Sequence, residues 1–187
     1  MDNTYYHVVR DWQGFYQVTG ESAATLTGLM FVTTTVGARA FTPTTLPILR
    51  SISSPILSYF TTAFLTSAVM CIPTQSQHWL SSEVGLIALM LSVRLTLMMR
   101  TLRRWHRQRP FERRHWVLRA GLPITACLSM AYAAITLWSG RLFGLDFICF
   151  AVLLLLLNGI FSAWEMTLQS MVVSDEDIVM IESIGVE

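Results

Sequence analysis

The sequence contains no lysine, and charged residues of any kind are scarce. Only 13% of the 187 residues are charged, roughly half the share of about 25% that is usual for soluble domains. Hydrophobic residues make up 53% of the chain, and the mean hydropathy is +0.51. These residues come in long blocks rather than in short periodic faces. The composition therefore indicates that lipid is the solvent of most of the chain.

Motifs for metal binding and catalysis are also lacking. The three cysteines lie inside apolar blocks, without the Cys-x-x-Cys or His/Cys spacing of a metal site. The sequence has no G-x-S-x-G, no H-E-x-x-H and no phosphate-binding glycine loop. The net charge of +1 offers nucleic acid no general attraction. We therefore expect no enzymatic activity, no cofactor, no metal and no nucleic-acid partner, and an enzyme acting on lipid is the least favoured class.

The leader, residues 1–20, lacks the basic start and apolar run of a cleavable signal peptide. We therefore expect the first membrane helix to act as its own signal. The apolar side chains Val8, Val9, Trp12 and Tyr16 recur at roughly helical spacing. This pattern predicts a short interfacial amphipathic helix. The alternative is that these residues form the packed start of a longer first helix.

Five apolar segments are long enough to cross a hydrocarbon core of ~30 Å, which takes roughly 17–25 residues. Ser53, Ser54 and Pro55 are typical of a helix start and predict where the second span begins. Pro123 is expected in the first turn of the fourth span. The sequence thus predicts an all-α polytopic membrane protein with one transmembrane domain over residues 21–171. The spans are expected at about 22–38, 56–72, 84–99, 120–138 and 145–169.

Arginine distribution predicts the orientation. The connection at 100–119 is rich in arginine, whereas residues 74–83 contain none. By the positive-inside rule the connection at 100–119 is a cytoplasmic loop, and the connection at 74–83 lies outside. The leader is then outside a bacterial inner membrane, and the acidic tail at 172–187 is cytoplasmic. The arginines expected to contact anionic lipid headgroups are Arg103, Arg104, Arg107, Arg109, Arg113 and Arg114.

A polar stripe marks the last predicted span. Its members are spaced by four, three and four residues, which places them on one helical face: Asn158, Ser162, Glu165 and Gln169. Three interpretations stay open, since such a stripe can hold a bundle together, line a path for an ion or solute, or handle protons. The path is favoured if the protein is a homo-oligomer.

Other polar residues lie at a similar predicted depth in two further spans. Thr33, Thr34 and Thr35 occupy the cytoplasmic half of the first span, and Arg94 lies about two turns from the cytoplasmic end of the third. An ion pair between Glu165 and Arg94 would lower the cost of holding both charges at membrane depth. We therefore expect these residues to form a buried polar cluster.

The stretch AATLTGLMFV, residues 23–32, follows an aromatic leader that contains Trp12, Phe15 and Tyr16. It resembles the first span of a loosely defined, uncharacterised family of small multi-span bacterial inner-membrane proteins, which reads approximately AALTGLLFV. The resemblance covers about the first 40 residues. It implies a multi-helix membrane protein with ordinary helix after residue 32, and it implies no activity and no site residues.

Two function classes follow. The favoured one is a homo-oligomeric, channel-like or pore-forming membrane protein lined by Asn158, Glu165 and Gln169. The alternative is a non-catalytic membrane adaptor, regulator or immunity-type protein that binds another membrane protein through the arginine loop and the acidic tail.

Overall fold

The computed structural model describes the backbone of residues 2–40, 46–73, 75–106 and 113–184. Side chains are described for residues 5–35, 54–73, 75–100, 121–165 and 167. The described part is all-helical, in agreement with the predicted fold class. Its helices are α1 (Asp2–Ala40), α2 (Leu46–Met70), α3 (Gln77–His106), α4 (Arg113–Trp138) and α5 (Gly144–Ile184).

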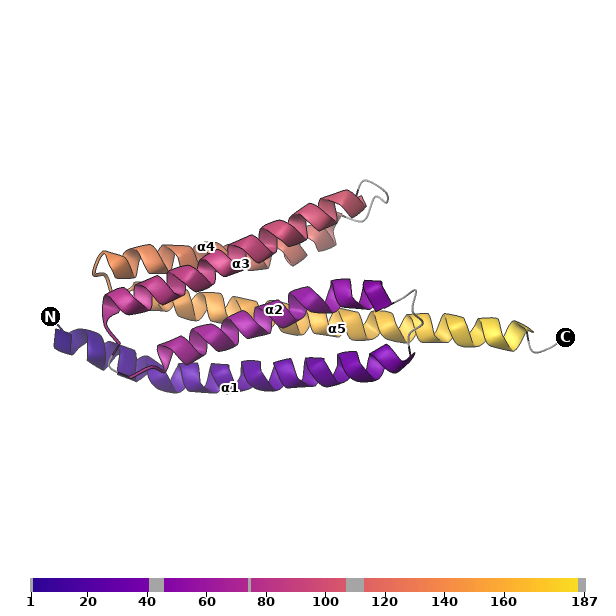
Figure 1. Ribbon diagram of the computed structural model, residues 1–187, viewed down its shortest axis with the longest axis horizontal. Helices are drawn as coiled ribbons and strands as arrows, with labels where there is room; N and C mark the ends of the chain where they lie inside the picture. The colour runs from indigo at the N-terminus through magenta and orange to yellow at the C-terminus, as the bar shows by residue number, and fades with distance from the viewer. Residues whose placement is uncertain (1, 41–45, 74, 107–112, 185–187) are drawn as a thin grey trace.

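The helices run lengthwise in one bundle (Figure 1). Consecutive helices pack as two hairpins, α1 with α2 and α3 with α4, and α2 also contacts α3. The last helix, α5, packs against α4 and α2 and touches α1. The α3–α4 hairpin diverges from the other helices toward the end that carries its own connection (Figure 1). The C-terminal helix therefore joins the two hairpins.

The core lies between these helices and is built from large side chains. Tyr16, Phe60, Met130 and Leu155 come from α1, α2, α4 and α5 and are almost completely buried. Tyr16 also donates a hydrogen bond from its hydroxyl to the carbonyl oxygen of Leu145, at 3.4 Å. This bond ties the leader to the start of α5.

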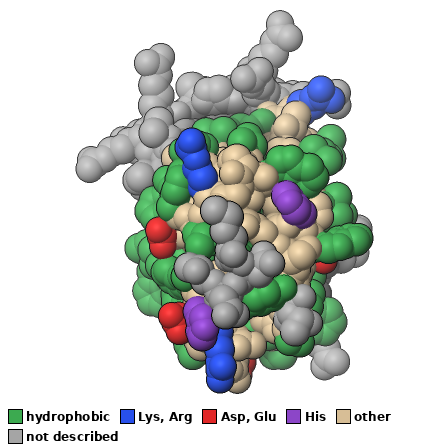
Figure 2. Space-filling model, turned by 90° about the vertical axis from the view of Figure 1, so that its left-hand side faces the viewer, with side chains coloured by type: hydrophobic (Ala, Val, Ile, Leu, Met, Phe, Trp, Pro, Cys, Tyr) green, Lys and Arg blue, Asp and Glu red, His purple; other side chains and the backbone are tan. Residues whose placement is uncertain are grey.

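The outer surface of the bundle is apolar. Large hydrophobic side chains are exposed on all five helices, for example Phe31 on α1, Phe64 on α2 and Trp164 on α5. Among the residues whose side chains are described, three stretches are long and apolar enough to cross a membrane, namely Gln77–Arg100, Gly121–Trp138 and Gly144–Glu165. Figure 2 looks onto the end of the bundle that carries the N-terminus, with charged and polar side chains across that end and hydrophobic ones around the sides. The structure thus indicates a membrane location, because water would not favour so much exposed apolar surface.

The helix bounds correct three expectations. The leader is not a separate interfacial helix, because α1 continues unbroken from Asp2 to Ala40. Val8, Val9 and Trp12 pack against the core, so the longer first helix is the correct alternative.

The proline and loop expectations are also wrong. Pro55 and Pro123 lie inside α2 and α4 rather than at their starts. Helix covers much of the predicted loop at 100–119, since α3 runs to His106 and α4 begins at Arg113. The membrane limits the apolar length of a span, but arginine is a good helix former and continues a helix into water.

Candidate functional site

The predicted polar stripe on α5 faces the interior of the chain's own bundle in its first half. Asn158 is 3% exposed and Ser162 is 7% exposed. Glu165 is half-buried, and the side chain of Gln169 lies outside the described residues. Burial is possible because Gly159, next to Asn158, lets the ring of Phe60 on α2 approach the α5 backbone. The first two stripe residues therefore contribute to the interior of a single protomer.

Asn158 has an unusual environment. Its side-chain nitrogen Nδ2 is buried and has no hydrogen-bond partner among the described residues. An unsatisfied buried donor costs about 1–3 kcal/mol, and lipid around the bundle supplies no replacement partner. Such a group is typical of a site that a water or another polar group completes.

Arg94 on α3 contacts α2. Its Nη1 donates a hydrogen bond to Ser58 Oγ at 2.9 Å, and its side chain is exposed. The helices α2 and α5 run antiparallel, and Gly159 lies opposite Phe60. Ser58 is therefore level with about residue 161 on α5, some ~6 Å along the helix from Glu165. The expected ion pair between Arg94 and Glu165 stays a prediction.

The hydroxyl groups of Thr33, Thr34 and Thr35 donate hydrogen bonds within α1 itself. Thr33 and Thr34 donate from Oγ1 to the carbonyl oxygen of Met30, at 3.0 and 2.9 Å. Thr35 donates in the same way to Phe31 and Val32. Each hydroxyl thus binds a backbone carbonyl three or four residues earlier, a common use of threonine inside a helix.

Polar contacts between helices occur at residues that the sequence did not single out. Thr19 on α1 and Ser67 on α2 bring their hydroxyl oxygens within 3.1 Å. Ser81 on α3 donates to the carbonyl oxygen of Ala134 on α4 at 2.7 Å, and Ser129 on α4 donates to that of Phe147 on α5 at 2.9 Å. These small polar side chains join neighbouring helices, as is usual in lipid. Single serines and threonines inside apolar runs gave no pattern from which to predict them.

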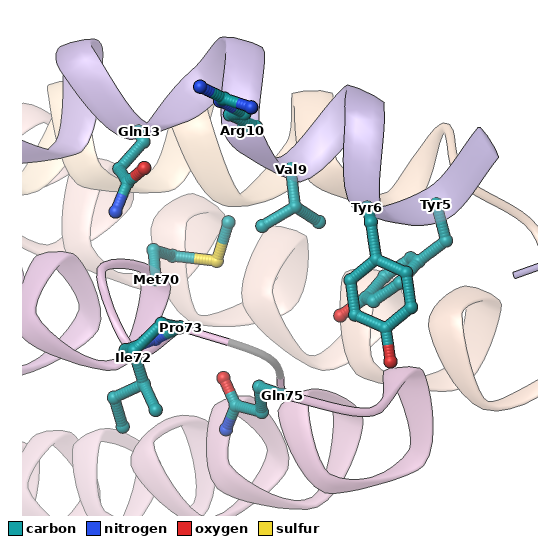
Figure 3. Close-up of a pocket in the computed structure, with 9 residues that line it drawn as sticks. All are labelled: Tyr5, Tyr6, Val9, Arg10, Gln13, Met70, Ile72, Pro73 and Gln75. Atoms are coloured by element: carbon teal, nitrogen blue, oxygen red, sulfur yellow. The ribbon is translucent and has the colours of Figure 1, made fainter. Parts of the chain in front are cut away.

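A second polar site, also not predicted, lies at the end of the bundle that carries the N-terminus. A pocket of about 220 Å³ lies between the first turns of α1 and the α2–α3 connection (Figure 3). Tyr5 lines it and is 6% exposed, and its hydroxyl has no hydrogen-bond partner among the described residues. Burial raises the pKa of this hydroxyl to about 12. We call this the Tyr5 pocket; its lining residues are Tyr5, Tyr6, Val9, Arg10, Gln13, Met70, Ile72, Pro73 and Gln75.

The predicted headgroup arginines are placed only by their backbone. Arg103 and Arg104 lie in the last turns of α3, and Arg113 and Arg114 begin α4. Arg107 and Arg109 lie outside the described residues. The two helix ends occur at the same end of the bundle, where the α3–α4 hairpin turns.

The part of the chain whose side chains are described contains no candidate metal site. No three His, Cys, Asp or Glu side chains there are close enough together to hold a metal ion.

Comparisons with protein-family models, with curated proteins and with solved structures found no match for this chain.

Proposed function

We propose that the protein is a five-span bacterial inner-membrane protein that acts as a non-conducting adaptor or regulator of another membrane protein. The observation that carries this proposal is the burial of Asn158 and Ser162 inside one protomer. A pore between identical copies needs its polar lining on the outer surface of each copy. The outer surface of α5 instead carries apolar side chains, such as Phe161 and Trp164, which suit lipid or a protein partner.

Five spans are proposed because α1 and α2 share the length and surface of the three apolar stretches. They contain 39 and 25 residues, and about 20 suffice to cross the membrane. Leu29 and Phe31 on α1, and Leu57 and Phe64 on α2, are exposed like the lipid-facing residues of α3 to α5. Together with the arginine distribution, this supports an external N-terminus and a cytoplasmic C-terminus.

The long helix α5 supplies the proposed contact with a partner. It contains 41 residues, or about 60 Å at ~1.5 Å per residue, whereas the hydrocarbon core is only ~30 Å thick. The described apolar stretch reaches Glu165, and α5 continues past the ends of the neighbouring helices (Figure 1). Its sequence carries Asp175, Glu176 and Asp177. A projecting helix with an acidic sequence offers a charged binding surface in water, separate from the arginine-rich ends of α3 and α4, which diverge from α5 (Figure 1).

The first experiment measures oligomeric mass in detergent and ion flux in liposomes. We expect a monomer without flux, and Glu165→Gln should change neither property. Glu21→Gln is the matched control, because Glu21 is an exposed carboxylate on α1. A defined oligomer whose ion selectivity changes with Glu165→Gln, and not with Glu21→Gln, would show a pore and refute the adaptor.

The second experiment tests partner binding directly. A photocrosslinking amino acid at position 177 should give one reproducible product with a membrane protein in intact cells. Replacing Asp175 and Glu176 by asparagine and glutamine should weaken that product, because the proposed contact is electrostatic. The same crosslinker at Phe161, which faces outward within the apolar stretch, serves as the control position. If only lipid products form at both positions, the proposed partner contact is wrong.

A further inference from the structure

The Tyr5 pocket combines a buried hydroxyl, one guanidinium and an apolar wall. Its volume of about 220 Å³ is below the ~300–1,000 Å³ of sites for drug-sized ligands. It therefore suits one small polar group with a few attached carbons. The buried Tyr5 hydroxyl at its wall has no partner among the described residues, and a buried hydroxyl without a partner is what a ligand would satisfy.

The polar side chains around the pocket include one cation, Arg10, together with hydroxyl and amide groups. Gln13 extends from α1 toward the pocket, the exposed Arg10 lies at its rim beside the α1 ribbon, and Gln75 extends from the α2–α3 connection on the other side (Figure 3). Gln75 donates its side-chain N–H to Glu83, which leaves its carbonyl oxygen on the pocket side. None of the lining residues is a carboxylate. One guanidinium and the Tyr5 hydroxyl, with no carboxylate among the lining residues, favour an anion.

The remaining wall is apolar. Val9 and Met70 face each other across the pocket (Figure 3), and Ile72 is a further apolar lining residue. The pocket lies at the end of the bundle that carries the N-terminus, and Figure 2 shows charged and polar side chains across that end with hydrophobic ones around the sides. An anionic group at that level can therefore keep an attached carbon chain in contact with apolar surface.

We propose that the Tyr5 pocket binds an organic phosphate, with Arg10 holding the phosphate oxygens and Tyr5 donating its hydroxyl to the same group. Guanidinium groups match phosphate because two N–H groups can bind two oxygens at once. The phosphate can belong to the headgroup of a membrane phospholipid or to a small soluble phosphate ester. With a phospholipid, the apolar wall contacts the glycerol and the first acyl carbons. With a soluble phosphate ester, part of this wall is left without a contact.

The test uses the full-length protein in a nonionic detergent and measures binding by calorimetry. The probes are a short-chain phosphatidylglycerol, the diacylglycerol of the same chain length, and glycerol phosphate. Binding of phosphatidylglycerol without binding of diacylglycerol would show that the phosphate is recognised. Binding of glycerol phosphate with equal affinity would identify a soluble ester as the source. If neither phosphate binds, or if diacylglycerol binds as tightly as phosphatidylglycerol, the proposal is overturned.

Two variants assign the contacts. Arg10→Gln should weaken phosphate binding about tenfold or more, since a charged hydrogen-bond pair is lost. Arg141→Gln is the matched control, because Arg141 is an exposed arginine on the α4–α5 connection at the same end of the bundle. Equal loss in both variants would mean general charge attraction and would overturn the site.

Tyr5→Phe removes the hydroxyl and keeps the ring in place. We expect several-fold weaker binding and an unchanged helix content by circular dichroism. Full affinity in this variant would overturn the role given to the Tyr5 hydroxyl. Because Arg10 is exposed, its substitution leaves the core intact, so the Arg10 result stands even if Tyr5→Phe alters folding.

Discussion

Replacing Gly159 with alanine tests how closely α5 approaches α2. A Cβ at this position would lie 2.8 Å from Cζ of Phe60 and 3.0 Å from its Cδ1, and closer still to Cε1. The ring of Phe60 is 1% exposed, so it has little room to move away. Overpacking of this kind costs about 1–3 kcal/mol. Alanine returns only about 0.5–1 kcal/mol through its better helix propensity, so the free energy of unfolding should fall by about 1–2 kcal/mol.

The measurement is reversible unfolding in mixed detergent micelles, followed by circular dichroism. Gly28→Ala is the matched control, because a Cβ at Gly28 on α1 meets no atom within 4 Å. This control should gain about 0.5–1 kcal/mol. Combining Gly159→Ala with Phe60→Leu should give a coupling energy of about 1 kcal/mol, since the shorter side chain makes room. If both alanine variants gain equal stability, the close contact between α2 and α5 does not exist.

Three further predictions concern buried or membrane-facing polar groups. Asn158→Leu should leave the free energy of unfolding unchanged or raise it by about 1 kcal/mol, because an unpartnered donor is removed; a loss above about 2 kcal/mol in denaturant titration would reveal a hidden partner. Glu165→Gln and Arg94→Gln should show non-additive losses in a double-mutant cycle, and additive losses would exclude the ion pair. Because burial raises the pKa of Tyr5 from 10.0 to about 12, its neutral form favours folding. The stability of the unmodified protein relative to Tyr5→Phe should therefore fall between about pH 10 and pH 12, and parallel pH profiles would contradict this.

The sequence predicted the helical class well, because block hydrophobicity directly reports the thickness of the bilayer. Block hydrophobicity does not predict where a helix ends once it has left the membrane. The end of α3 and the start of α4 therefore lie beyond the expected spans. Their arginine-rich sequence is too polar to be counted in a membrane span, but arginine has a high helix propensity. The prediction that Pro55 marks a helix start was wrong because helices in membranes tolerate an internal proline when other groups satisfy the freed carbonyl.

The candidate site was predicted only in part. The spacing of Asn158 and Ser162 predicts that they share one face of α5, and both are buried, but spacing alone does not say whether that face lies inside the protomer. That depends on the small size of Gly159, which admits Phe60. The Tyr5 pocket was missed because Tyr5 and Gln75 are 70 residues apart in the chain. Only the folding of α1 along the α2–α3 connection brings them to the same cavity.

The position of α5 has a consequence for biosynthesis. A chain made from its N-terminus releases α1 with α2, and then α3 with α4, as two hairpins. The helix that contacts both hairpins is made last, and it supplies Leu145, the acceptor for Tyr16. Until α5 inserts, the faces of α2 and α4 that it covers remain open to lipid or to a chaperone of the insertion machinery. The final helix thus acts as the closing step of assembly, and a ribosome that stalls before it leaves two hairpins that lack most of the contacts joining them.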